Sequence, residues 1–153
     1  MNDKDKKLNV LLNQRTISRS LPISLLRTRE HVMVPIRPIL SKIGISEQKW
    51  RILRVLGEDG PIEQSTIARK VCLLLPSLTR ILHKMEQDGQ IIRWQDKTDR
   101  RRTLVNNTEI GNDIINSQLP ATTKIYKTLE KKLGTRKLEK LLDLLEEIQN
   151  IKF

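Results

Sequence analysis

The sequence has few of the side chains on which catalytic and metal sites depend. Among 153 residues there is one cysteine, Cys72, and there are two histidines, His31 and His83. One cysteine excludes an intrachain disulfide and a cysteine-rich zinc site. The chain also lacks the residue spacings of a nucleophile elbow, a phosphate-binding loop or a metal site. We therefore expect a protein that is not an enzyme and that needs no metal or other cofactor.

Long apolar segments are missing as well. No apolar run approaches the roughly 18 residues that a membrane-spanning helix needs. The first twenty residues are mostly polar and basic, and they lack the apolar core of a signal peptide. The sequence therefore predicts a cytoplasmic protein that stays out of the membrane.

Acidic residues are too few to balance the basic ones. The 29 Lys and Arg residues against 18 Asp and Glu residues give a formal net charge of +11. Such an excess favours a polyanionic partner, first nucleic acid and second an anionic membrane surface. The excess is spread along the chain and is locally dense only from residue 93 to residue 102. Charge alone therefore leaves open a nonspecific architectural DNA-binding protein.

Residues 61–106 contain the pattern around which the rest of the chain is organised. A helix is predicted over residues 76–87, with a proline at its first position. The apolar side chains of this helix recur with the helical period, and they are Leu78, Ile81, Leu82 and Met85. Strand-like residues 91–94 and 103–105 then flank a polar turn that is rich in arginine. A helix followed by an arginine-tipped hairpin is typical of a protein that reads nucleic acid.

Three further helices are expected before this one. They are predicted over residues 22–44, 47–56 and 64–71. Pro35 and Pro38 should bend or break the first, because proline removes a backbone donor and clashes with the preceding turn. Ser46 is a suitable N-cap for the second. Residues 57–61 are rich in glycine and acidic residues and are predicted to form a loop.

Two long helices are expected after the hairpin. Asn106 and Glu109 resemble a capping box at the start of the first, and Pro120 should kink that helix without dividing it. Thr135 is the expected cap of the second. The second helix carries a wide apolar stripe made of Leu138, Leu141, Leu142, Leu145 and Ile148. Stripes this wide often form dimer seams, although an ordinary core is the alternative.

Several short motifs in these segments resemble those of a known family. They are residues 67–68 together with 73–80, the segment 86–93, the turn residues Asp96, Asp99 and Arg101, and the later residues Thr108, Glu109 and Gly111. Together they resemble the winged helix-turn-helix regulators of the MarR family, over residues 22–150. Thr98 and Asn107 depart from the family pattern, in which arginine and leucine are frequent at these places. Within the family, motifs in residues 29–38, 47–51 and 72–79 resemble the branch that regulates homoprotocatechuate breakdown.

This resemblance implies a mainly α-helical fold with a small β-hairpin wing, a winged helix-turn-helix with dimerisation helices at both ends. We expect a flexible basic arm at residues 1–21, a dimerisation region at 22–44 and 107–153, and a DNA-binding lobe at 45–106. A homodimer of this kind presents two recognition helices about 34 Å apart, which is one turn of DNA. It would therefore read a pseudo-palindromic operator in double-stranded DNA.

The resemblance and the width of the major groove together nominate residues for DNA contact. On the helix they are Pro76, Ser77, Thr79, Arg80, His83 and Lys84, and on the wing they are Asp99, Arg100, Arg101 and Arg102. In the family pattern Asp99 orients Arg101, and Arg101 meets the DNA. Because side chains alternate along a strand, another arginine of the run should turn back. A solvated helix face and a solvated turn are the alternatives.

The family also implies a ligand pocket lined by its first, second and fifth helices. The side chains nominated for this pocket are Arg29, Met33, Trp50 and Arg54. A small aromatic or phenolic acid in the pocket would release a repressor, by favouring a dimer whose recognition helices are misplaced. Each of these side chains can equally belong to the core or the surface.

Cys72 permits a different form of control, in which an oxidant releases the DNA. Its sequence neighbours, Val71 and residues 73–75, are apolar. Apolar surroundings raise the pKa of a thiol and slow its oxidation. A structural cysteine is therefore the favoured interpretation, and a redox-responsive regulator is the alternative.

Overall fold

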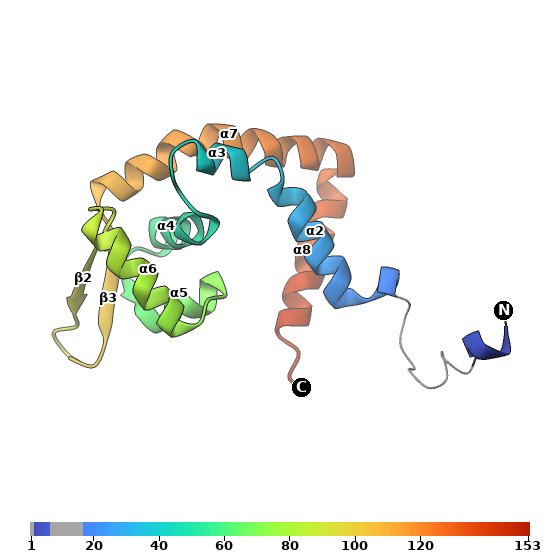
Figure 1. Cartoon of the computed structure of the whole chain (residues 1–153), viewed down its shortest axis with the longest axis horizontal. Helices are drawn as coiled ribbons and strands as arrows, with labels where there is room; N and C mark the ends of the chain where they lie inside the picture. Colours follow the sequence, from blue (N-terminus) through green and yellow to red (C-terminus); the bar gives the residue numbers. More distant parts are fainter. Residues whose placement is uncertain (1, 7–16) are drawn as a thin grey trace. The chain divides into compact units, whose positions relative to one another are not determined.

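The computed structural model of the chain describes residues 2–6 and 17–153 and is mainly helical (Figure 1). The chain divides into two compact units, Met1–Arg37 and Pro38–Phe153. Most of the predicted N-terminal arm, including residues 7–16, lies outside the described residues. The proposed division into an arm, a dimerisation region and a DNA-binding lobe stays a prediction.

Between residues 17 and 37, the first unit consists mainly of one exposed helix. A 3-10 turn, η1 (Ile17–Arg19), precedes α2 (Leu21–Met33), which has a proline in its first turn and no buried residue. A turn follows, and α3 (Arg37–Ser41) begins at the last residue of the first unit. The predicted break near the two prolines is confirmed, because α2 ends two residues before Pro35.

Three helices supply most of the core of the second unit, and they are α4 (Glu47–Asp59), α5 (Gln64–Val71) and α6 (Leu75–Gln87). Ile91, Val105 and Ile115 complete this core. Ser46 caps α4 as predicted, since its hydroxyl accepts from the amide of Lys49. Of the apolar side chains predicted on the helix over residues 76–87, Leu78, Leu82 and Met85 are buried and Ile81 is half-buried. The other buried side chains of these helices include Ile52, Leu53, Leu56, Ile67 and Val71. The loop predicted at residues 57–61 is wrong in part, because α4 continues to Asp59.

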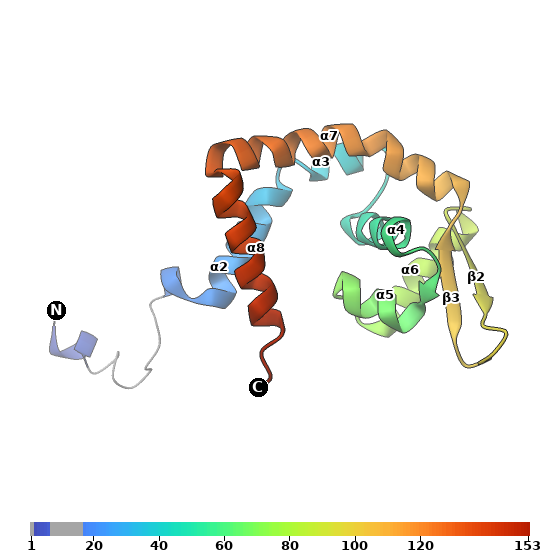
Figure 2. The ribbon, with the colours of Figure 1, turned by 180° about the vertical axis from the view of Figure 1, so that it is seen from behind.

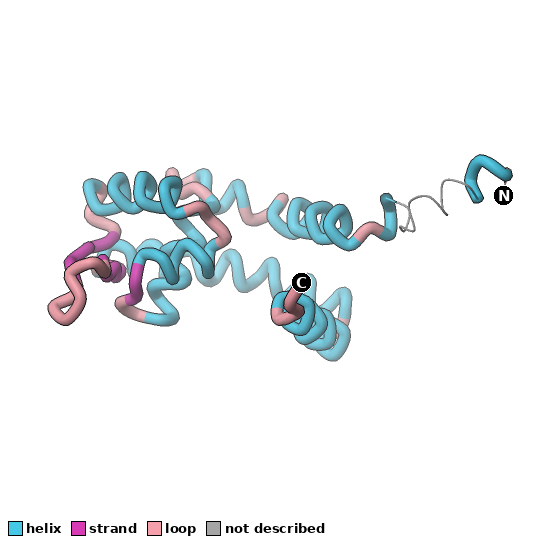
Figure 3. Tube along the Cα trace, turned by 90° about the horizontal axis from the view of Figure 1, so that it is seen from below, coloured by secondary structure: helices cyan, strands magenta, loops and turns pink. Residues whose placement is uncertain are grey.

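A three-stranded antiparallel sheet joins these helices (Figure 3). Its strands are β1 (Ile62–Glu63), β2 (Ile91–Gln95) and β3 (Thr103–Asn107), in the order β1-β3-β2. The sequence predicted β2 and β3 but not β1. Two residues are too few for a recognisable strand pattern, and β1 exists only through its pairing with the middle of β3. We call α4 to α6 with this sheet the lobe, and β2, β3 and the turn between them the wing.

The long helix α7 (Glu109–Leu133) contains Pro120 and is a single element, as predicted. Its cap is not the predicted Asn106, which lies in β3 paired with Ile92. Thr108 caps the helix instead, because its hydroxyl accepts from the amide of Gly111. A Cβ added to Gly111 would lie 2.3 Å from the carbonyl oxygen of Gln90, so only glycine fits this approach of α7 to the lobe.

Asn107 departs from the family pattern, and its position explains how an amide is accommodated there. The side chain is buried at the end of β3, and its Nδ2 donates to the carbonyl of Leu53 at 2.9 Å. It also donates to Oδ1 of Asn112 at 3.2 Å. The polar residue therefore connects the end of the wing to both α4 and α7.

The last helix, α8 (Thr135–Gln149), follows α7 after a turn at Gly134, whose φ is 96° (Figure 2). The predicted cap is off by one residue, because Gly134 holds the cap position. The hydroxyl of Thr135 donates to Glu130 instead. No residue of α8 is buried, and Leu141, Leu142, Leu144 and Ile151 remain exposed at the end of the chain.

None of the helices in residues 2–6 and 17–153 combines the length and the apolar character that crossing a membrane requires.

Candidate nucleic-acid interface

Helix α6 has one face inside the lobe and one face in solvent. Leu78, Leu82 and Met85 have no accessible surface, and they fix the rotation of the helix. Five of the six residues nominated on this helix are exposed and Ser77 is half-buried. The six nominated residues, Pro76, Ser77, Thr79, Arg80, His83 and Lys84, therefore share the outer face.

The start of α6 has fewer backbone donors than an ordinary helix. Leu74 is in the cap position without a side-chain hydrogen bond, and the helix begins at Leu75, one residue earlier than predicted. Pro76 in the first turn has no N–H. The amides of Leu75 and Ser77 remain as donors at the positive end of the helix dipole, where an anion is favoured.

The polar side chains on the outer face of α6 differ in whether they already have hydrogen-bond or ion-pair partners within the protein. Lys84 lies 3.0 Å from a carboxylate oxygen of Asp88, and the ring of His83 is 3.1 Å from the amide nitrogen of Gln87. The bond from Lys84 holds the pKa of Asp88 below its ordinary value, with Lys49 contributing. The side chain of Arg80 has no hydrogen bond or ion pair within the described residues. It is thus the cation of α6 that is most available to a ligand.

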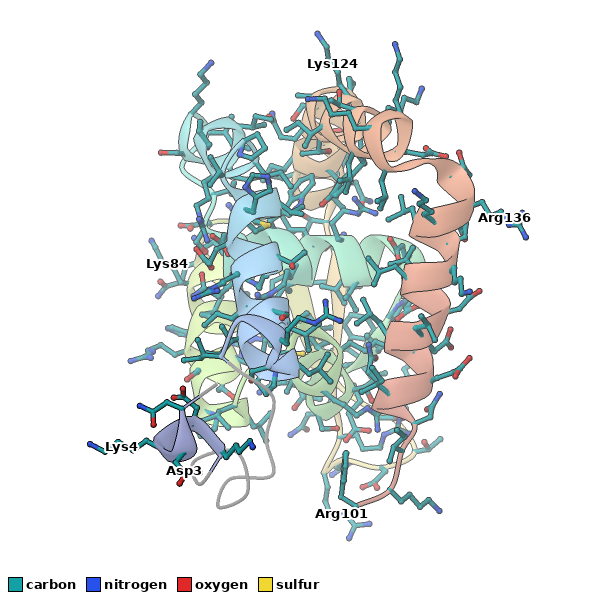
Figure 4. All side chains as sticks on the ribbon, turned by 90° about the vertical axis from the view of Figure 1, so that its right-hand side faces the viewer. Asp3, Lys4, Lys84, Arg101, Lys124 and Arg136 are labelled. Carbon is teal, nitrogen blue, oxygen red and sulfur yellow. The ribbon has the colours of Figure 1, made fainter. Side chains whose placement is uncertain are left out.

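The turn of the wing holds one arginine outward. The guanidinium of Arg101 donates to both carboxylate oxygens of Asp99, at 3.1 and 3.3 Å, although the side chain is 91% exposed. This bond is the main reason why the pKa of Asp99 lies below its ordinary value. Figure 4 shows Arg101 pointing away from the ribbon. The expectation that Asp99 orients Arg101 is confirmed.

The neighbouring arginines behave differently. Arg102 turns back and forms ion pairs with Glu63 at 3.1 Å and with Asp96 at 3.3 Å. The pKa of Asp96 is lowered, first by the amide and hydroxyl of Thr98 and then by Arg102. Arg100 is exposed and has no partner in the described part of the chain. The prediction that the three arginines cannot all point the same way is confirmed, and Arg102 is the one that braces the turn.

A further ion pair fixes the wing to α6. The guanidinium of Arg93 on β2 donates twice to one oxygen of Glu86 on α6, at 3.0 and 2.6 Å. The hydrogen bonds from Arg93 are the largest cause of the lowered pKa of Glu86. Sequence reasoning missed this pair and missed Glu63, because both depend on contacts between segments that only the fold brings together.

The residues nominated for the ligand pocket fall in both units. Trp50 is buried on α4, and the guanidinium of Arg54 lies 5.9 Å from the centre of its ring. Arg54 also pairs with Glu58 at 2.9 Å and lines a pocket of about 450 Å³. The other residues of this pocket are Gly57, Glu58, Asn112, Ile115, Asn116 and Leu119. Arg29 and Met33 belong to the first unit, and their part in a pocket stays a prediction.

Cys72 does not have the surroundings that its sequence neighbours suggested. It is exposed at the end of α5, in a left-handed conformation with a φ of 56°. The apolar residues that follow Cys72 in the sequence do not cover it. Two of them are themselves in solvent, since Leu74 is 77% exposed and Leu75 is 47% exposed. The predicted apolar environment of the thiol is therefore wrong, and oxidant sensing stays an untested alternative.

Comparison with known proteins agrees with this geometry. Residues 45–103 match the model of the MarR family. The chain is 36% identical over 132 residues to the HTH-type transcriptional regulator FarR of Neisseria gonorrhoeae, covering 86% of this chain and 90% of FarR. The chain belongs to the MarR family. It is therefore a winged helix-turn-helix transcription regulator that binds DNA, and not an enzyme.

Two further similar proteins support the resemblance to one branch. The homoprotocatechuate degradative operon repressor of Escherichia coli is 36% identical over 128 residues, covering 84% of this chain and 86% of the repressor. The crystal structure of NadR in complex with 4-hydroxyphenylacetate has a TM-score of 0.83 and 34% identity. The match covers 91% of this chain and 99% of NadR.

Proposed function

We propose that the chain is a homodimeric repressor that binds a pseudo-palindromic operator and is released by a small aromatic acid. The observation that carries the DNA-binding part is the state of Arg101. This guanidinium is 91% exposed, yet Asp99 holds it through two hydrogen bonds. A solvated arginine of no function needs no such support, whereas an arginine that enters a DNA groove benefits from being positioned in advance.

Helix α6 and the wing contribute differently to DNA binding in this proposal. Arg80 on α6 can bond the O6 and N7 atoms of a guanine in the major groove, because its guanidinium has no partner among the residues that the structure describes. Arg101 on the wing contacts the minor groove or the phosphate backbone, which carries little sequence information. Arg80 therefore contributes specificity, and Arg101 contributes affinity for any duplex.

Competition binding tests this division. A duplex enriched from a random library by the wild-type chain serves as the operator, and single-base variants and scrambled DNA serve as competitors. Arg101→Ala should weaken binding to all duplexes alike, whereas Arg80→Ala should also reduce discrimination at one base pair by about tenfold or more. Arg136→Ala on α8 is the control for loss of one exposed charge (Figure 4). Equal losses of specificity in the Arg80 and Arg101 variants would contradict the division.

A reporter gene placed behind the enriched duplex tests the sign of regulation. We expect expression to fall when the chain is produced and to recover when an effector is added. A rise in expression on production of the chain would mean an activator.

The apolar face of α8 supports the proposed homodimer. Leu141, Leu142 and Leu144 are 42%, 50% and 45% exposed in the single chain. Several large apolar side chains left exposed on one helix are characteristic of an interface between subunits. MarR-family regulators bind DNA as dimers, and the same arrangement is proposed here.

The proposed effector site centres on Arg54. Its guanidinium lies at the wall of a pocket of about 450 Å³, so an aromatic carboxylate can find a cation there. Trp50, whose ring centre is 5.9 Å from this guanidinium, is buried and does not line the pocket. Glu58 now occupies this guanidinium at 2.9 Å, and a ligand carboxylate would have to replace it. The complex of NadR with 4-hydroxyphenylacetate suggests the class of ligand.

Thermal unfolding with two matched probes tests the effector. We expect 4-hydroxyphenylacetate to raise the melting temperature, since a ligand at 100 times its Kd stabilises by about 2.7 kcal/mol. The neutral alcohol 4-hydroxyphenylethanol should have little effect, and Arg54→Gln should abolish the shift. An equal shift with the alcohol, or an undiminished one in the variant, would exclude Arg54 as the carboxylate partner.

A further inference from the structure

Two adjacent residues at the junction of β1 and α5 contact both the wing and α6. Glu63, the last residue of β1, accepts from Arg102 of the wing at 3.1 Å. The next residue, Gln64, begins α5, and its Nε2 donates to the hydroxyl of Thr79 on α6. Two adjacent residues thus hold the turn of the wing and a residue on the outer face of α6.

The hydroxyl of Thr79 has a second partner within its own helix. Its hydrogen is donated to the carbonyl of Leu75 at 2.9 Å. A threonine hydroxyl offers one hydrogen and two lone pairs. The bond to Leu75 uses the hydrogen, and the bond from Gln64 uses one lone pair. Thr79 therefore keeps one acceptor site and its methyl group for a ligand, and it keeps no donor.

This state decides which DNA groups Thr79 can meet. Phosphate oxygens, guanine O6 and N7, and thymine O4 are acceptors, and an acceptor-only hydroxyl cannot bond to them. The exocyclic amino groups of adenine and cytosine are donors and can bond to it. The methyl group of Thr79 can contact the methyl group of thymine. An A·T pair offers both a donor and a methyl group in the major groove, and a G·C pair does not.

We propose that Gln64 is a specificity-determining positioning residue, which holds Thr79 so that it selects an A·T base pair in each half-site. This inference rests on the proposed function, because it takes α6 to be the helix in the major groove. Gln64 acts through Thr79, so its removal should change discrimination at one position and leave general affinity for DNA nearly unchanged.

The test compares Gln64→Met with Thr79→Val, each in the full-length chain. Methionine keeps the size of the side chain and cannot donate, and valine keeps the methyl group while removing the hydroxyl. With the duplex enriched by the wild-type chain, we expect Gln64→Met to lower the preference for A·T over G·C at one position by about threefold to tenfold. Affinity for scrambled DNA should change by less than about twofold. Replacing the thymine of that pair by uracil should weaken wild-type binding, since the methyl contact is lost.

A double-mutant cycle separates positioning from an independent contact. If Gln64 acts through Thr79, the double variant should discriminate no worse than Thr79→Val alone. Gln64→Glu, which also cannot donate to Thr79, should lose discrimination like Gln64→Met, and it serves as the second variant should the methionine variant unfold. Additive losses, unchanged discrimination in both Gln64 variants, or a G·C pair at the affected position would overturn the inference. If the wild-type chain enriches no duplex at all, the proposed function itself fails.

Discussion

Helices α6 and α8 have similar apolar patterns in the sequence, but they differ in how far the apolar side chains are buried. Both carry leucines on one stripe, yet α6 buries Leu78 and Leu82 completely while α8 buries none of its residues. The lobe thus completes its core within one chain, and α8 does not. The same periodicity predicts a buried face in both cases, but only the neighbouring elements decide what covers it. For α8 we propose that the cover is a second copy of the chain.

The largest effect should come from the core of the lobe. Leu82→Ala removes a side chain with no accessible surface and should lower the free energy of unfolding by about 2–5 kcal/mol. Urea denaturation followed by circular dichroism at two protein concentrations measures the loss. We expect the same loss at both concentrations, because the side chain is buried within one chain. A loss that disappears at high concentration would mean that the lobe depends on the partner for its core.

The next effect should fall on α8. Leu142→Glu puts a charge on a side chain that is half exposed in the single chain, and an interface at this face would have to bury that charge. We expect the dimer dissociation constant to rise by about 100-fold or more, measured by sedimentation equilibrium, with helical content retained. Lys140→Glu, on an exposed position of the same helix, is the control and should change dimerisation little. Equal behaviour of the two variants would exclude this face as the seam.

Two helical glycines, Gly111 and Gly57, lie where α7 contacts the lobe, and they differ in the space available for a side chain. A Cβ on Gly111 would lie 2.3 Å from a backbone oxygen, whereas a Cβ on Gly57 would lie 3.0 Å from the end of the Ile115 side chain. Backbone yields less easily, so Gly111→Ala should destabilise by about 1–3 kcal/mol. Gly57→Ala should change stability by less, because alanine gains up to about 1 kcal/mol in helix propensity. Thermal melts of the two variants that differ by less than their error would contradict this packing.

The smallest effect concerns the ion pair between Glu86 and Arg93. The folded pKa of Glu86 lies below its ordinary value of 4.5, so the unfolded chain takes up the proton first as the pH falls. Stability from the pair is present above about pH 4.5 and is lost as the pH falls through the folded pKa. Glu86→Gln should cost only about 0.2–1 kcal/mol at neutral pH, since the carboxylate is 38% exposed and screened by water. Denaturation at pH 7 and pH 3 should show the difference from wild type shrinking at the lower pH, and a constant difference would argue against the pair.

Features of the fold that depend only on residues close together in the sequence could be predicted from the sequence. The cap at Ser46 and the burial of Leu78, Leu82 and Met85 on α6 follow from local spacing, and they were predicted correctly. The cap of α7 was misplaced because three polar residues in a row, 106–108, all suit that position. Pairing with β2 takes the first two into β3 and leaves Thr108.

In the candidate site, too, only contacts between residues close in the sequence were predicted. Arg101 and its support by Asp99 lie two residues apart and were predicted, whereas the bond from Gln64 to Thr79 spans 15 residues and was not. Arg102 has its partner Glu63 at a separation of 39 residues. Sequence patterns name the side chains that can reach DNA, and the fold decides which of their donors and acceptors are already used.

The proposal that two copies of the recognition helix read one operator can be tested by changing the spacing of the half-sites. Binding to the enriched duplex is measured at constant salt with both half-sites at their selected spacing, with five base pairs inserted between them, and with one half-site scrambled. We expect tight binding only to the first, because half a turn of DNA puts the second site on the opposite face of the duplex. Equal affinity for all three duplexes would contradict a dimer that reads two half-sites.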